Sequence, residues 1–282
     1  MSSYAESIKS LARPLERFDD LTPLINQIKD KKVVMLGESS HGTSEYYQWR
    51  REISLELIKN HGFSFIAVEG DWPPCQKACQ YIENGKGNAL DALMAFDRWP
   101  TWMWANTEVG ELLDELKALD KKTGFHGLDV YSLVDSVDET VKHLHKINPS
   151  LASKVFDLYS CFEPFRHDEK EYARSLIKFP DGCREEVVTS LQEILKIKLK
   201  NEAHTSHLFN ALQNAKIVHN AEKYYRAMVS FNDNSWNVRD HHMMDVLGFT
   251  KRNNRLGYGN LGVLHNDCKN TKSFGTKGGE QL

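Results

Sequence analysis

The sequence predicts an α/β fold, with a largely parallel central sheet flanked by helices and an added helical subdomain. In the first half of the chain, short apolar runs typical of buried strands alternate with segments of helical periodicity. From residue 132 onward strand signals are rare, and long helical patterns replace them. No Pro-rich or Ser-rich linker separates the two halves, so the helices are expected to be an insertion or appendage of the sheet domain.

Three strands are expected in the first 131 residues, each a short apolar run bounded by turn residues. They cover residues 32–37, 64–68 and 124–129. The helices between them are predicted at residues 44–59, 72–82, 89–94 and from about 107 to 121. Thr43 or Ser44 can cap the first of these helices, Gly62 ends it, and Asp71 can cap the second, in front of a first turn that tolerates proline.

Helices dominate the second half of the chain. Apolar residues recur there at spacings of three and four, which allows the helices to pack on one another. The predicted helices cover residues 134–147, 151–162, 169–177, 185–199 and 208–229. A further helix at 235–247 carries Arg239, His242 and Met243 on one face.

These patterns divide the chain into four segments. Residues 1–131 form the sheet domain, 132–232 the helical subdomain, and 233–247 a helix that returns to the core. Residues 248–282 are rich in Gly, Asn and Lys and are expected to be a weakly ordered tail. Within this tail, residues 261–265 are strand-like but too short to assign.

Composition narrows the classes of partner. The formal net charge of −3 and the sequence pI near 6.5 give no electrostatic reason to expect a nucleic acid or an anionic membrane as partner. No apolar run approaches the roughly 20 residues that span a bilayer. The first residues also lack the layout of a secretory signal, so a cytoplasmic location is expected. The five cysteines form no CxxC pair, and their odd number argues against a complete disulfide framework.

Acidic side chains and a histidine follow the predicted strands. The segment LGESSHG at residues 36–42 places Glu38 and His41 where the first strand ends. Glu69 and Asp71 follow the second strand, and Asp129 follows the third. If the three strands are parallel neighbours, these five residues converge at one edge of the sheet, where α/β proteins usually bind their ligands.

Several familiar motifs are absent or incomplete. A serine nucleophile elbow requires glycine where His41 stands, and a carboxylate–histidine metal pair with the spacing of Glu38 and His41 requires a helix. The chain contains no H-E-x-x-H, no P-loop and no G-x-G-x-x-G after a strand. A histidine among carboxylates remains, which suits general acid–base catalysis. The alternative is that His41 caps the next helix or binds a backbone carbonyl.

Arg50 and three tryptophans extend the candidate site. Arg50, nine residues after His41, can reach the same edge and polarise a substrate oxygen, or form an ordinary ion pair with Glu45 or Glu52. Trp99, Trp102 and Trp104 can wall an apolar ligand cleft or pack in the core.

Five spaced blocks resemble the erythromycin esterase family. They are GESSHG at residues 37–42, Arg50 at its spacing from them, AVEGDWP at 67–73, GLDVYS at 127–132 and NSWNVRD at 234–240. The blocks occur in the family's order, and the resemblance runs from about residue 10 to residue 247. It covers most of the chain.

This resemblance implies a function. It implies hydrolysis of a macrolactone-type ester by an activated water, with no covalent enzyme intermediate, no cofactor and no obligatory metal, and a link to macrolide resistance at the level of the family. His41 matches the general base, and Glu38, Glu69 and Arg50 match the other active-site positions. Three further residues of the same edge, Asp71, Asp129 and Trp102, are expected to contact a small-molecule ester substrate.

The resemblance ends near Leu247. Family members supply further strands, one of which ends in an A-H-N-x-H block, and only Leu264-His265-Asn266-Asp267 resembles the first half of that block. The chain is therefore expected to be a truncated or frameshifted family member. Two alternatives remain: an inactive member that keeps the cleft as a binding surface, and a metal-dependent hydrolase of another small ester or phosphoester.

Overall fold

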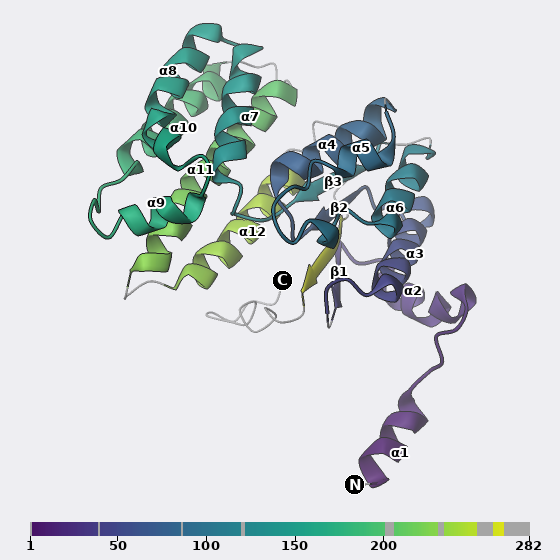
Figure 1. Ribbon diagram of the computed structural model, residues 1–282. Helices are drawn as coiled ribbons and strands as arrows, with labels where there is room; N and C mark the ends of the chain where they lie inside the picture. The colour runs from purple at the N-terminus through teal and green to yellow at the C-terminus, as the bar shows by residue number, and fades with distance from the viewer. Residues whose placement is uncertain are drawn as a thin grey trace.

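A computed structural model describes residues 2–38, 40–85, 87–119, 122–200, 206–230, 234–252 and 262–267. The chain forms a small parallel sheet with helices against it and a separate group of helices beside it (Figure 1). The α/β class predicted from the sequence is confirmed, although helices make up most of the molecule.

The sheet consists of four parallel strands. Their order is β1-β4-β2-β3. The strands are β1 (Val33–Glu38), β2 (Phe65–Val68), β3 (Gly124–Gly127) and β4 (Gly262–Asp267). In register, Leu264 of β4 lies opposite Met35 of β1 on one side and Ala67 of β2 on the other.

Alternate residues of β2 enter two different cores. Ile66 and Val68 belong to the core formed with the helices of the first half of the chain. Phe65 and Ala67 belong to a smaller core on the opposite face, together with residues of the last two helices. This alternation follows from the two-residue period of a strand, so helices cover both faces of the sheet.

The helices of the first half begin and end at recognisable residues. Asn88 and Asn106 cap α5 and α6 through their side-chain oxygens, and Gly85 ends α4 in the left-handed conformation. In Figure 1, α1 extends away from the rest of the molecule. The elements are α1 (Ser2–Leu11), η1 (Phe18–Leu21), α2 (Thr22–Ile28), α3 (Ser44–Asn60), α4 (Trp72–Asn84), α5 (Ala89–Leu93), η2 (Thr101–Met103) and α6 (Thr107–Lys117).

The helices of the second half have a core of their own. The long helix α11 packs against α7, α9, α10 and α12 and supplies many of its buried residues. The elements are α7 (Leu133–His145), α8 (Pro149–Tyr159), η3 (Ser160–Phe165), α9 (Glu169–Ser175), α10 (Arg184–Lys200), α11 (Ser206–Val229) and α12 (Ser235–Arg252). Cys161 and Cys183 form a disulfide across this group, whereas Cys75 and Cys79 are free and buried in α4.

The structure adds to the expectations for the end of the chain and for the order of the strands. Of the segment from residue 248, which was expected to be a weakly ordered tail, the described parts are the end of α12, which continues to Arg252, and β4 at Gly262–Asp267. The first two strands are not neighbours, because β4 lies between them. Backbone pairing with β1 and β2 supplies the stability that the polar sequence around β4 does not indicate.

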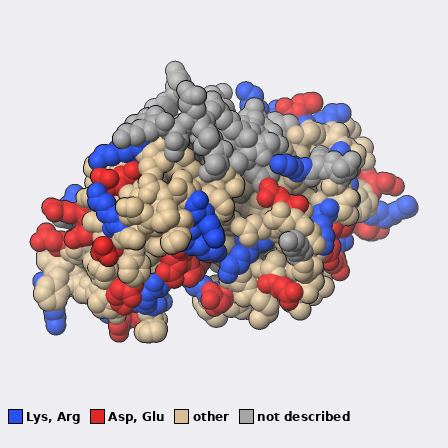
Figure 2. All heavy atoms as spheres, turned by 90° about the horizontal axis from the view of Figure 1, so that it is seen from above, with Lys and Arg blue, Asp and Glu red and all other residues tan. Residues whose placement is uncertain are grey.

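Two features describe the outside of the molecule: the distribution of its charged side chains and the polarity of its long helices. On the part of the face in Figure 2 that the structure describes, basic and acidic side chains are interspersed. Across the described residues, no helix combines the length and apolar character that a membrane span requires.

Candidate functional site

The carboxyl ends of the four strands meet at one edge of the sheet, because all four strands are parallel. The segments after β1, β2 and β3 therefore begin at this edge, as predicted. The backbone of His265 in β4 lies opposite Leu36 of β1 and Val68 of β2. The side chain of Glu38, the last residue of β1, lies outside the described residues.

Arg239 joins the acids that follow β2 and β3. Its Nε donates to Oδ1 of Asp129 at 2.9 Å, and its Nη2 donates to Oδ2 of Asp129 at 2.7 Å and to Oε1 of Glu69 at 2.5 Å. The backbone N–H of Val130 also donates to Oδ1 of Asp129, at 2.8 Å. All three charged side chains are buried, and a guanidinium with two carboxylates in this geometry holds each of them in place.

A second ion pair lies beside the first. Arg98 donates from Nε to Oδ2 of Asp71 at 2.5 Å. The cationic carbons of Arg98 and Arg239 lie 4.7 and 5.0 Å from the centre of the Tyr131 ring. Tyr131 therefore connects the two pairs through cation–π contacts. Asp71 precedes α4, as predicted, but its side chain binds Arg98 and does not cap the helix.

The backbone brings these pairs close together. A side chain at Gly127 would place its Cβ 2.4 Å from the carbonyl oxygens of Gly70 and Asp71, so only glycine allows β3 to end so near the segment after β2. The backbone N–H of Asp129 donates to the carbonyl of Gly70 at 3.0 Å.

Burial and neighbouring charges set the ionisation of this cluster. Burial raises the pKa of Asp71 to about 6, against the opposing effect of Arg98, and the charge of Asp129 adds to the increase. Burial also acts to raise the pKa of Asp129, but the charge and hydrogen bonds of Arg239 outweigh it and hold that pKa below its usual range. The ion pairs raise the pKa values of Arg98 and Arg239, against the opposing effect of desolvation.

His242 supports the cluster from α12. Its Nδ1 lies 2.8 Å from Nδ2 of Asn220, which donates, and its Nε2 lies 3.1 Å from the backbone oxygen of Asp129. The proton of the ring is therefore on Nε2. Burial lowers the pKa of His242 to about 4, so the ring is neutral near pH 7 and serves as a neutral link between α11, α12 and the end of β3.

His41 lies half-buried in the turn that follows β1. The next residue, Gly42, has φ of +76°, and a Cβ there would meet the Trp102 ring at 2.9 Å. The ring of Trp102 thus packs on the turn that carries His41, while 44% of the residue stays exposed to solvent.

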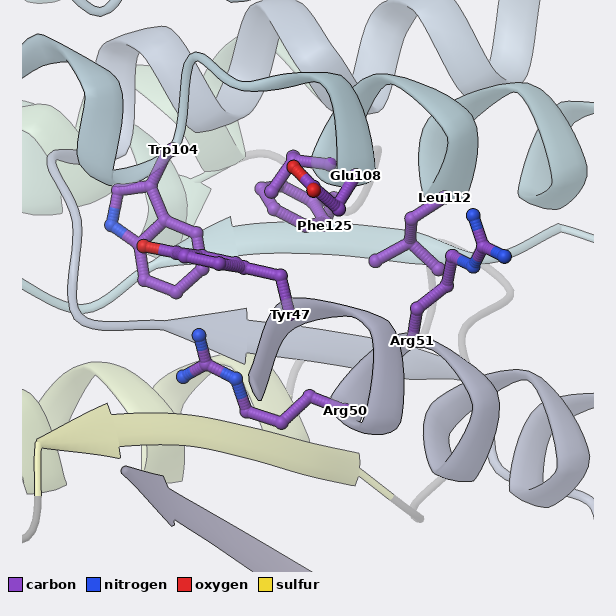
Figure 3. A pocket seen from close by; sticks show the side chains of 8 residues that line it. Tyr47, Arg50, Arg51, Trp104, Glu108, Leu112 and Phe125 are labelled. Atoms are coloured by element: carbon purple, nitrogen blue, oxygen red, sulfur yellow. The ribbon is translucent and has the colours of Figure 1, made fainter. Parts of the chain in front are cut away.

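Arg50 and Trp104 connect this turn to the acids. The guanidinium of Arg50 lies over the Tyr47 ring at 4.7 Å and near the Trp104 ring at 5.8 Å. In Figure 3 it points toward these rings, whereas Arg51 points away; Arg51 pairs with Glu52 and Glu111. Trp104 donates from Nε1 to the backbone oxygen of Glu69 at 2.8 Å.

The cavity drawn in Figure 3 is not a substrate pocket. It holds about 10 Å³, which is about the space of one water molecule. It lies between α3, α6 and β3.

The structure joins some of the predicted residues more directly than others. Hydrogen bonds connect Glu69 and Asp129 through Arg239, and Asp71 lies beside them. The links to His41 and Arg50 are less direct: the ring of Trp102 packs on the turn that carries His41, and Arg50 lies near the ring of Trp104, which donates to the backbone oxygen of Glu69.

Sequence reasoning missed two arginines of this cluster, Arg98 and Arg239. Arg239 was placed on a helix face with His242, but nothing indicated that this face would meet Asp129. The available signal was an arginine on a helix face that also carries His242 and Met243. If that face is buried, the arginine requires a carboxylate partner, because a buried cation is costly without one. Within the described residues, no group of three or more His, Cys, Asp or Glu side chains is arranged to hold a metal ion.

Comparison with known proteins identifies related sequences. The profile of the erythromycin esterase family matches residues 58–257. Erythromycin esterase type II of Escherichia coli is 28% identical over 126 residues, which are 43% of this chain and 28% of that protein. The aligned segment thus spans less than a third of that curated relative.

Solved structures share the fold. The crystal structure of a succinoglycan biosynthesis protein superposes with a TM-score of 0.76 at 20% identity and covers 94% of this chain. A protein from Bacillus cereus gives 0.75 at 18% identity and 94% coverage. A mutant of the erythromycin esterase EreC in its open conformation gives 0.62 at 16% identity and 89% coverage. This chain covers 66%, 65% and 64% of these three proteins.

Proposed function

We propose that this chain, which belongs to the erythromycin esterase family, hydrolyses a carboxylic ester of macrolactone type. Membership of the family supports an esterase-like hydrolase. The observation that carries the finer proposal is the position of His41, half-buried in a turn at the same sheet edge where Arg239 fixes the carboxylate of Glu69.

The proposed reaction uses water as the nucleophile. His41 accepts a proton from a water molecule while the water oxygen attacks the ester carbonyl carbon. The carbonyl oxygen becomes an oxyanion, which the guanidinium of Arg50 stabilises. When the intermediate collapses, the C–O bond of the ester breaks, and the departing alkoxide takes the proton back from His41. The products are a carboxylic acid and an alcohol.

The acids of the edge have different proposed roles. Glu38 and Glu69 orient His41 or the attacking water. Asp129 has both carboxylate oxygens on Arg239, so its proposed contribution is to hold Arg239 and, through it, Glu69. Asp71, beside this cluster, and the half-exposed Trp102 are proposed to contact the substrate.

Replacement of the proposed base tests the assignment. His41→Asn should lower kcat/KM for erythromycin, followed by mass spectrometry of the ring-opened product, by about 100-fold or more. His145→Asn is the matched control, because His145 is exposed on α7 away from the sheet edge, and it should keep wild-type turnover. Undiminished turnover in His41→Asn would exclude the proposed base.

Two further measurements separate the alternatives. Turnover that requires stoichiometric metal and disappears after chelation would favour the metal-dependent hydrolase. A cooperatively folded chain that binds the macrolide without hydrolysing it would favour the binding protein.

A proposed role in macrolide resistance predicts that expression in a susceptible bacterium raises the inhibitory concentration of erythromycin, and that His41→Asn abolishes this increase.

A further inference from the structure

A second polar cavity lies among the helices of the second half, between α10, α11 and α12. Its volume is about 690 Å³, which is within the range of roughly 300–1,000 Å³ that small-molecule sites occupy. It lies where α11 ends and α12 begins. In Figure 1 this junction of the two helices is toward the lower left, away from the strands. The proposed hydrolytic site does not use any of the residues that line it.

Basic side chains outnumber acidic ones in the wall of this cavity. Arg184, Lys223 and Arg226 line it together with one acid, Glu222. Glu222 is only 2% exposed and is already occupied, because Arg226 and the hydroxyl of Tyr172 both donate to its Oε1. In the part of the chain that the structure describes, Arg184 and Lys223 make no ion pair. The cavity therefore has two positive charges that no wall carboxylate neutralises.

Arg226 is held in a fixed position beside these charges. Its guanidinium donates to the backbone oxygens of Pro180 and Asp181 as well as to Glu222. Because three acceptors on two segments bind it, Arg226 is ordered before any ligand arrives, and less conformational entropy is lost on binding.

The backbone adds to the positive potential. The first residue of α10 is Arg184, and the first turn of α12 contributes Asn237 and Val238 to the wall. Both helices are longer than fifteen residues, and each N-terminus carries a partial positive charge that favours an anion. At α12 this is an effect of the helix dipole, because the N–H groups of Asn237 and Val238 already donate to the carbonyl of Asn234. Glu185 and Glu186, the acids in the first turn of α10, are not among the lining residues.

Part of the remaining wall is apolar, and His219 and Asn234 complete it with polar side chains. Val187, Val188, Ala227 and Val238 contribute aliphatic surface. A ligand that carried only charge would leave this surface against water, whereas a ligand with an anionic group and a small apolar group would cover both parts.

We infer that this cavity binds a small organic anion, whose phosphate or carboxylate group pairs with Arg184 and Lys223 and whose apolar group packs on the valines. Arg226, which is paired with Glu222, forms a fixed part of the wall, and the two helix N-termini add to the positive field. The ligand is a small molecule and not a polymer, since the basic residues line a cavity of limited volume and not an extended surface.

Isothermal titration calorimetry with phenylphosphonate tests this inference. Phenylphosphonate combines an anion with an apolar ring, and the hydrolytic reaction cannot consume it because it contains no ester. It should bind with a stoichiometry of one at this site, more tightly than inorganic phosphate, whereas benzyl alcohol should show no comparable binding. Salt near 1 M should weaken the binding through screening.

Two charge variants locate the binding. Lys223→Gln and Arg184→Gln should each weaken phenylphosphonate about tenfold, because each removes a charge-assisted contact. The controls are Lys146→Gln and Arg174→Gln, which remove the same charges from exposed positions outside the cavity. Circular dichroism would verify the fold of each variant. The inference is overturned if the wild-type chain does not bind phenylphosphonate, or if Lys223→Gln and Arg184→Gln bind it as the wild type does.

Discussion

Arg239 donates two hydrogen bonds, of 2.9 and 2.7 Å, to the carboxylate of Asp129, a residue 110 positions earlier in the chain. The same guanidinium reaches Glu69, 170 positions away. One residue of α12 therefore fastens the segments that follow β2 and β3 to each other. The helices α7 to α11 lie between Asp129 and Arg239 in sequence. The contact between these two residues therefore also joins the end of this helical segment to the sheet.

The first prediction concerns Arg239. Arg239→Gln should lower the free energy of unfolding by about 3–5 kcal/mol, because it leaves the buried carboxylates of Asp129 and Glu69 without their cation. Arg239→Lys should recover only part of this loss, since an ammonium cannot make the two parallel bonds that Arg239 makes to Asp129. Urea denaturation followed by circular dichroism measures both.

A surface arginine provides the comparison. Arg166 forms ion pairs with Asp138 and Glu163, whose side chains are about half exposed, so Arg166→Gln should cost no more than about 1 kcal/mol. Equal losses in Arg166→Gln and Arg239→Gln would contradict the assigned importance of the buried cluster.

The second prediction concerns Asp71 and pH. Burial raises the pKa of Asp71 to about 6 in the folded chain, above the ordinary value of 3.8. The folded state then holds a proton that the unfolded state releases, so the stabilisation is present below about pH 4 and is lost as pH rises through about 6. Asp71→Asn should remove this contribution, which is at most about 1.4 kcal/mol per pH unit. Urea denaturation of both proteins from pH 4 to 7 measures it, and parallel profiles would contradict it.

The third prediction concerns His242, whose contribution to stability changes with pH in the direction opposite to that of Asp71, over an overlapping pH range. Burial lowers the pKa of His242 from 6.5 to about 4, so the unfolded state binds the proton first. Stability attributable to His242 is therefore lost as pH falls from about 6.5 to 4. His242→Gln should lose less stability on acidification than the wild type, as measured by thermal unfolding at pH 7 and pH 4.5. The control His145→Gln, at an exposed position, should keep the wild-type difference between the two pH values.

Local signals predicted most of the fold. Strands β1, β2 and β3 begin within a residue of their expected starts, since each is an apolar run between turn residues. The run at residues 261–265 was strand-like but too short to assign, because Gly262–Asp267 contains few apolar residues and lies among glycines and asparagines. Its place between β1 and β2 depends on pairing with distant strands, which no local pattern reports.

The candidate site was predictable in its positions but not in its partners. The strand ends indicated Glu69, Asp71 and Asp129 because parallel strands share a carboxyl edge. The choice of Arg98 and Arg239 as their partners depends on how the segment before η2 and the helix α12 return to that edge, which is a tertiary property. The disulfide between Cys161 and Cys183 was not predicted either, because a spacing of 22 residues does not specify which cysteines pair.

The fourth prediction tests the central position of β4. Leu264 lies opposite Met35 on one side and Ala67 on the other, so β4 has a paired neighbour on both edges. A backbone N–H in such a strand always points toward one of the two neighbours, and proline removes that donor. Leu264→Pro should therefore destabilise the chain by about 3 kcal/mol or more.

Leu264→Ala separates the effect of the backbone from that of the side chain, because alanine keeps the N–H and removes only aliphatic volume. Within the described sheet, β1 pairs with β4 alone, so loss of the β4 ladder should also release β1. Hydrogen exchange of the amides of Val34 and Met35 should accelerate in Leu264→Pro, and much less in Leu264→Ala. If Leu264→Pro unfolds at the same urea concentration as Leu264→Ala and protects β1 equally well, then β4 does not form the centre of this sheet.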